Sequence, residues 1–130
     1  KNMDSVVHFE IPYKESKRAR HFYENVFGWE IKDSGMEGLE YFIATTGPTG
    51  KDRMPKEPGF ISGGMTPGND KLKAPVIAMR VDDIKKTLEK VEDYDGKRLM
   101  DPMSIGDMGY YTYVQDSEGS VIGIWQDKKK

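Results

Sequence analysis

Residues 8–29 carry the most informative pattern in the sequence, and they read HFEIPYKESKRARHFYENVFGW. Residues 5–11 are rich in β-branched and aromatic side chains, which favours a strand, and Pro12 is predicted to end it. A helix is predicted next, because four apolar side chains recur at the spacing of one helical face. These are Ala19, Phe22, Tyr23 and Val26. Gly28 is expected to end this helix, since glycine readily adopts a left-handed conformation there.

After residue 29 the chain has short β-type segments and turns, and then the order of a strand, a helix and further strands begins again. Strands are predicted at residues 29–32, 41–45 and 60–66, and residues 67–73 have the composition of a linker. A fifth strand is predicted at 75–81. Asp82 is predicted to cap a second helix with Ile84, Leu88 and Val91 on its apolar face. The last predicted strands are 97–100, 110–115 and 120–126, with a tight turn at 116–119.

The two halves of the chain match each other, with one shift for their first elements and a smaller shift for their last strands. A shift of 68 positions places His8 on Val76 and Gly28 on Gly96, and a shift of 60 places Gly63 on Gly123. Chance register of ordinary elements is the alternative explanation. The repeat predicts an α+β fold in which residues 1–130 form a single domain. Two βαβββ half-modules, about 5–66 and 75–126, would form a curved, cup-shaped mixed sheet with helices on its convex side. The concave cup would suit a small molecule.

Composition limits the classes of function. Twenty basic and 22 acidic side chains give a net charge of −2, so the sequence shows no basic surface for nucleic acid. It contains no apolar run of about 20 residues that could cross a membrane, and no signal peptide is expected. The absence of cysteine excludes disulfides, thiolate metal sites and a cysteine nucleophile. A cytoplasmic location is the default expectation.

The opening and closing segments together resemble one protein superfamily. The opening has FY, then VFGW at residues 26–29, and the closing hairpin at residues 116–126 is DSEGSVIGIWQ. Val81 to Ile84 matches the start of the second helix. The chain therefore resembles the vicinal-oxygen-chelate superfamily of glyoxalases, bleomycin-resistance proteins and extradiol dioxygenases. The resemblance is closest to the glyoxalase-like subgroup, extends over almost the whole chain, and implies the cup-shaped fold described above.

The same resemblance implies where a metal would bind. Metal-using members take ligands from inner strands of both halves, at positions that correspond to His8, Gly63, Val76 and Gly123 in this chain. Of these four side chains, His8 alone can bind a metal, whereas a catalytic zinc normally keeps three protein ligands. No cofactor is therefore expected, and a weakly bound divalent metal is the alternative. An organic ligand could instead occupy the vacated metal position.

His8 and Glu10 are the candidate catalytic pair, because residues two apart in a strand share a face and a carboxylate can tune a histidine. A hydrogen-bonded pair without catalysis is the plainer interpretation, and Arg80 is a candidate partner for Glu10. Ligand-binding candidates are residues that alternation places on the cup side, or glycines that would enlarge it. They are Gly63, Arg80, Tyr111, Tyr113, Gly123 and Trp125.

Three functions remain open at this stage. The first is a metal-free protein that binds a small organic molecule. The second is a lactoylglutathione-lyase-related or isomerase-type enzyme that uses His8 and Glu10. The third is an interaction module. A homodimer is expected from the resemblance, no nucleic-acid or membrane partner is expected, and the loop at residues 48–59 is a candidate cover for the cup.

Overall fold

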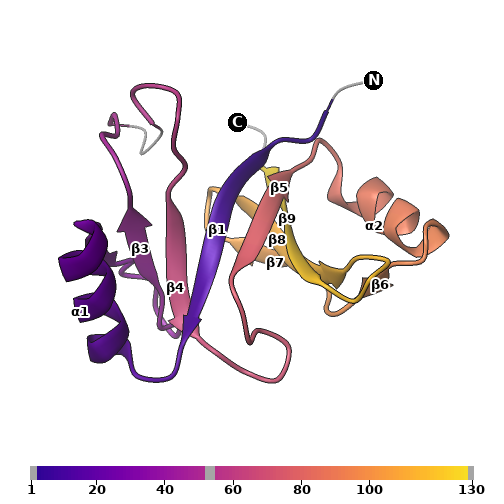
Figure 1. Cartoon of the computed structure of the whole chain (residues 1–130). Coiled ribbons are helices and arrows are strands. Elements are labelled where there is room, and N and C mark those ends of the chain that lie inside the picture. Colours follow the sequence, from indigo (N-terminus) through magenta and orange to yellow (C-terminus); the bar gives the residue numbers. More distant parts are fainter. Residues whose placement is uncertain (1–2, 52–54, 129–130) are drawn as a thin grey trace. The chain divides into compact units, whose positions relative to one another are not determined.

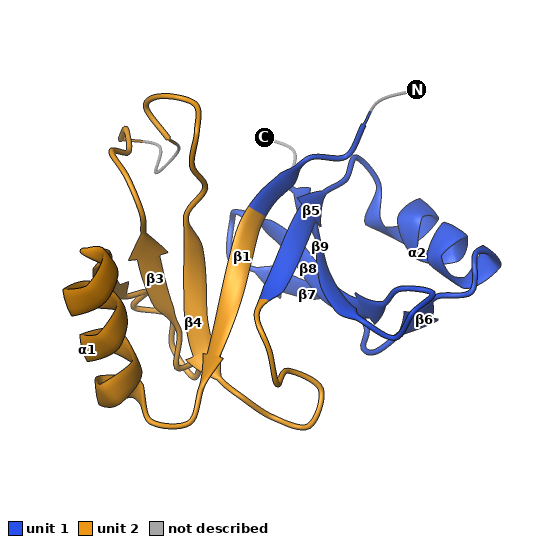
Figure 2. Ribbon diagram, viewed as in Figure 1, with its two compact units in different colours: residues 1–7, 76–130 blue, residues 8–75 orange. Residues whose placement is uncertain are grey.

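The computed structural model describes residues 3–51 and 55–128 (Figure 1). The chain divides into two compact units, shown in Figure 2. Unit 1 comprises residues 1–7 and 76–130, and unit 2 comprises residues 8–75. The proposed cover loop lies partly outside the described residues. Neither helix of the described chain is long and apolar enough to cross a membrane.

The described residues of unit 2 form one helix and four strands, the first of which begins two residues before the unit. Its elements are β1 (Val6–Tyr13), α1 (Ser16–Phe27), β2 (Glu30–Asp33), β3 (Phe42–Thr45) and β4 (Gly63–Pro67). The strands are ordered β2-β3-β4-β1. The β1 and β4 strands are parallel, and the other neighbouring strands are antiparallel.

Unit 1 repeats this arrangement with one additional short strand. Its elements are β5 (Val76–Arg80), α2 (Ile84–Asp93), β6 (Lys97–Arg98), β7 (Met103–Ile105), β8 (Gly109–Gln115) and β9 (Val121–Asp127). The strands are ordered β6-β8-β9-β5, with β7 also paired to β8. The β5 and β9 strands are parallel, as β1 and β4 are. The predicted α+β class and the βαβββ module are therefore confirmed in each unit.

The helix α1 packs through a different face from the one predicted. Ala19 and Tyr23 pack against the core of unit 2, as expected, but Phe22 and Val26 are 53% and 56% exposed. Tyr23 stacks on Trp29 with ring centroids 4.9 Å apart, and this stacking orients the helix. The prediction for Phe22 and Val26 was wrong because apolar side chains occur on two adjacent faces of this helix, and the sequence does not show which one packs.

Of four predicted element ends, one was located correctly and three were displaced by one to three residues. Gly28 ends α1 with a φ of 70°, as predicted. Pro12 does not end β1, because the strand continues to Tyr13 beside β4. Asp83, rather than Asp82, caps α2 by accepting a hydrogen bond from the backbone N–H of Lys86. The strand predicted at 60–66 is shorter and begins at Gly63.

In each unit the strands bury one face against the helix of that unit. In unit 2 the buried cluster includes Ile11, Phe42 and Met65, and α1 lies against it. In unit 1 the cluster includes Val114 and Ile124, together with Ile84 and Leu88 of α2. Because side chains alternate along a strand, the residues between these positions lie on the face away from the helix. Those faces carry the predicted site residues other than Gly63, which pairs with Phe9 on the helix side.

Candidate functional site

His8 and Glu10 lie on the face of unit 2 that points away from α1. Their neighbours Phe9 and Ile11 pack on the helix side, so alternation along β1 places the histidine and the carboxylate opposite. Glu10 is only 3% exposed. A buried carboxylate needs hydrogen-bond partners, because leaving it unpaired costs several kcal/mol.

Tyr41 connects the two predicted catalytic residues. Its hydroxyl donates a hydrogen bond to Oε2 of Glu10 at 2.8 Å, and its oxygen lies 2.9 Å from Nε2 of His8. With the carboxylate ionised, the Tyr41 proton points at Glu10, so His8 must donate its Nε2–H to the tyrosine oxygen. The Nδ1 atom of His8 is then left as an acceptor.

Burial lowers the pKa of His8 to about 4, because an imidazolium ion would lose its hydration in this position. The ring is therefore neutral near pH 7. The chain from His8 through Tyr41 to Glu10 holds one tautomer of a neutral imidazole, which suits hydrogen bonding to a ligand or proton acceptance at Nδ1. The predicted pair is thus joined through a third residue, which the sequence interpretation had not selected.

Gly64 provides the space for the Tyr41 hydroxyl. Glu10 pairs with Gly64 in the parallel register of β1 and β4, so both lie on the same face. A β-carbon at residue 64 would lie 1.9 Å from the Tyr41 oxygen. Gly63 pairs with Phe9 on the helix side, and the Phe9 ring fills the space that a side chain there would take. The predicted register of this strand was therefore displaced by one residue, and Gly64 corresponds to Gly123.

The remaining predicted ligand-binding residues lie on the face of unit 1 away from α2. Tyr113 pairs with Gly123, and Tyr111 pairs with Trp125, so these four share one face. Tyr110 and Thr112 alternate with them along β8, and Tyr110 packs on the α2 side. The rings of Tyr111 and Tyr113 meet edge to face at 5.1 Å.

The space above Gly123 is filled by the protein itself. A β-carbon at residue 123 would lie 2.1 Å from the Tyr111 hydroxyl. The expectation that Gly63 and Gly123 enlarge a cup is therefore not met, because Phe9 and Tyr111 occupy the space beside them. Contact of either glycine with a ligand stays a prediction.

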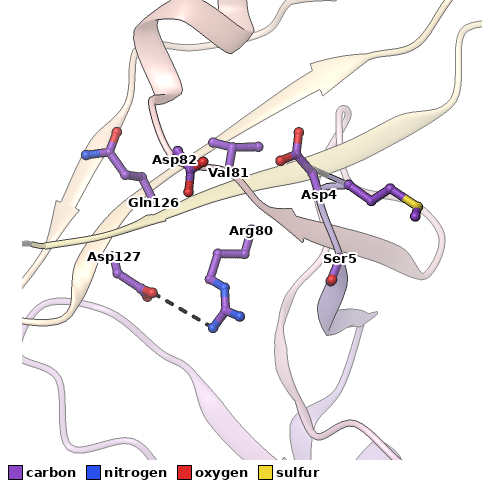
Figure 3. Close-up of a pocket in the computed structure, with 8 residues that line it drawn as sticks. Asp4, Ser5, Arg80, Val81, Asp82, Gln126 and Asp127 are labelled. Atoms are coloured by element: carbon purple, nitrogen blue, oxygen red, sulfur yellow. Dashed lines mark ion pairs between the residues drawn. The ribbon is translucent and has the colours of Figure 1, made fainter. Parts of the chain in front are cut away.

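Arg80 lines a pocket of about 370 Å³ within unit 1 (Figure 3). The charged and polar lining residues are Asp4, Ser5, Arg80, Asp82, Gln126 and Asp127. The Arg80 guanidinium lies 3.9 Å from the Asp127 carboxylate, whose other oxygen accepts a hydrogen bond from the indole of Trp125 at 2.6 Å. Arg80 was a candidate partner for Glu10, and the ion pair seen here is with Asp127. The volume is that of a small-ligand pocket.

The described residues do not fit a protein-held metal of the kind that the resemblance implies. They contain no group of three or more His, Cys, Asp or Glu side chains that could bind an ion. In unit 2 the register places Gly64 beside Glu10, and in unit 1 it places Gly123 beside Ala78. Glycine and alanine supply no ligand atom, whereas a catalytic zinc normally has three protein ligands.

A family model for the Glyoxalase/Bleomycin resistance protein/Dioxygenase superfamily matches residues 5–124. The chain belongs to this superfamily. The "Putative glyoxylase CFP32" of Mycobacterium tuberculosis is 29% identical over 114 residues. The match covers 86% of this chain but 41% of that relative, so the chain spans about two fifths of its length. A "Glyoxylase-like domain-containing protein" of Didymella fabae is 29% identical over 88% of each chain.

Solved structures share the superfamily fold at low sequence identity. Hypothetical protein BH1468 from Bacillus halodurans aligns with a TM-score of 0.65 at 12% identity, over 99% of this chain and 98% of that one. A Streptomyces coelicolor methylmalonyl-CoA epimerase in complex with 2-nitronate-propionyl-CoA aligns with a TM-score of 0.65 at 14% identity, over 98% and 100%. These similarities show the fold alone.

Proposed function

We propose that this superfamily member binds a small organic molecule without a protein-held metal, on the face of unit 2 that carries His8. The observation that supports this most directly is the hydrogen-bonded chain from His8 through Tyr41 to Glu10. A buried polar network of this kind is costly unless its members are fixed, and once fixed it presents a defined hydrogen-bonding group. A neutral ligand with a hydroxyl or N–H donor would suit Nδ1 of His8.

An enzyme of the isomerase or glyoxalase type is the second candidate. The neutral His8 could accept a proton at Nδ1, and the resulting imidazolium would be stabilised through Tyr41 by the Glu10 carboxylate. The low pKa of His8 makes it a weak base, however, and a general base works best with a pKa near the operating pH. Binding is therefore the better-supported function. An interaction module remains the third candidate function, and a cytoplasmic location and a homodimer remain part of the proposal.

Native mass spectrometry of protein purified without added metal tests this proposal. We expect a retained organic mass, or an empty protein that takes up an organic ligand in a screen followed by thermal shift. A His8→Ala variant should lose the organic ligand while its circular dichroism spectrum is unchanged. One tightly held metal ion per chain would contradict the proposal and favour the enzyme. The same spectra report whether the protein is a dimer.

A further inference from the structure

The Tyr41 hydroxyl contacts both polar groups that a metal ion held by His8 and Glu10 would have to bind. Its oxygen is 2.9 Å from Nε2 of His8 and 2.8 Å from Oε2 of Glu10. A zinc ion bound by both atoms would have to lie about 2.0–2.2 Å from each of them, and the phenol oxygen already makes a hydrogen bond to both. When Glu10 is ionised, the Nε2 atom carries the proton of its hydrogen bond to Tyr41, so it has no lone pair for a metal in that state.

The same arrangement of tyrosine over glycine occurs in both units. In unit 2, Ile43 pairs with Gly64, and Tyr41 precedes Ile43 by two residues. In unit 1, Tyr113 pairs with Gly123, and Tyr111 precedes Tyr113 by two residues. In both cases the hydroxyl lies about where the β-carbon of another residue would be, at 1.9 Å and 2.1 Å.

This repetition shows that the two tyrosines occupy equivalent places in the two modules. In each module the position on the last strand where the superfamily can carry a metal ligand is a glycine, and a phenol oxygen covers it. The space beside Gly64 is therefore occupied by the hydroxyl of Tyr41, and the space beside Gly123 by the hydroxyl of Tyr111, from the same unit in each case.

We infer that the Tyr41 hydroxyl excludes metal ions from the position between His8 and Glu10 and holds His8 as the tautomer protonated at Nε2. This inference deepens the proposed function, because it names the residue that makes the site metal-free and that leaves Nδ1 for a ligand. Tyr41 is a positioning residue, since it acts through His8. Removal of its oxygen would open the space between Nε2 of His8 and the Glu10 carboxylate to a cation.

The test compares Tyr41→Phe with the wild type and with Tyr94→Phe, a matched loss of a phenol at a site that is 77% exposed. Each protein is titrated by calorimetry with zinc, nickel and manganese alone. We expect Tyr41→Phe to bind one ion per chain at least tenfold more tightly than the wild type or Tyr94→Phe. The gain should vanish when His8→Ala is added. Equal metal affinity in Tyr41→Phe and the wild type would overturn the inference.

A second measurement needs no variant, so it is independent of any folding defect. The nitrogen NMR signals of the His8 ring in the wild type distinguish the two neutral tautomers. A proton on Nε2 supports the inference, and a proton on Nδ1 overturns it. Neither experiment uses an organic ligand. A failure to find such a ligand would therefore count against the proposed function, while the metal titration and the tautomer would still decide this inference.

Discussion

The hydroxyl of Tyr41 and the α-carbon of Gly64 are packed so closely that no larger residue fits at position 64. An added β-carbon would lie 1.9 Å from the Tyr41 oxygen and 2.1 Å from the ring carbon that bears it. Both residues belong to unit 2, on the face that carries His8 and Glu10. The glycine is therefore required by the tyrosine, and this pair keeps the polar network in place.

We expect Gly64→Ala to lower the free energy of unfolding by about 1–3 kcal/mol, as overpacking of a well-packed site does. In a Tyr41→Ala background the same substitution should cost much less, because the clashing phenol is gone. Urea unfolding of the two single variants and the double variant measures the coupling between the residues. Additive losses would show that Gly64 is needed for a reason other than space for Tyr41.

The free energy of unfolding should fall as the pH is lowered, over a range set by the pKa of His8 in the folded and unfolded states. Its pKa is about 4 in the folded protein, against 6.5 for a histidine side chain in an unfolded chain. The unfolded state therefore binds more protons between these values, so stability is full above about pH 6.5 and is lost as the pH falls towards 4. The loss is at most about 3 kcal/mol, at 1.36 kcal/mol per pKa unit. His8→Gln removes this contribution, so the pH dependence of its unfolding by urea should be flatter over that window. Parallel curves for the two proteins would contradict the burial of His8.

Substitutions on the two aromatic faces of α1 should lower the free energy of unfolding by very different amounts. Tyr23 packs on the core and stacks on Trp29, so Tyr23→Ala should lower the free energy of unfolding by about 2–4 kcal/mol. Phe22 is 53% exposed, and Phe22→Ala should cost less than about 1 kcal/mol. The two variants differ by one position on the same helix, so each serves as the control for the other. Equal losses in thermal or urea unfolding would mean that Phe22 is buried in solution, for example against another chain.

The sequence predicts the fold well because strand alternation, helix periodicity and the repeat all indicate the same module. The register of β4 was displaced by one residue because Gly63 and Gly64 are adjacent and neither has a side chain to mark a face. Tyr41 was missed as a site residue for a related reason. It lies just before β3, and its contact with Glu10 depends on the pairing of β3, β4 and β1, which no local pattern specifies.

The Arg80→Ala variant tests whether Arg80, in the pocket of unit 1, contributes to ligand binding without contributing to stability. The ion pair with Asp127 is 3.9 Å long, and both side chains are about half exposed, so its loss should change the free energy of unfolding by less than about 1 kcal/mol. If Arg80 binds the ligand that the protein retains, the bound fraction seen by native mass spectrometry should fall at least tenfold. Arg98→Ala is the matched control, because Arg98 also makes a partly exposed ion pair, with Glu92 at 3.0 Å, and lies on β6. Equal retention by Arg80→Ala, Arg98→Ala and the wild type would remove Arg80 from the ligand site and leave its pocket without a role in this binding.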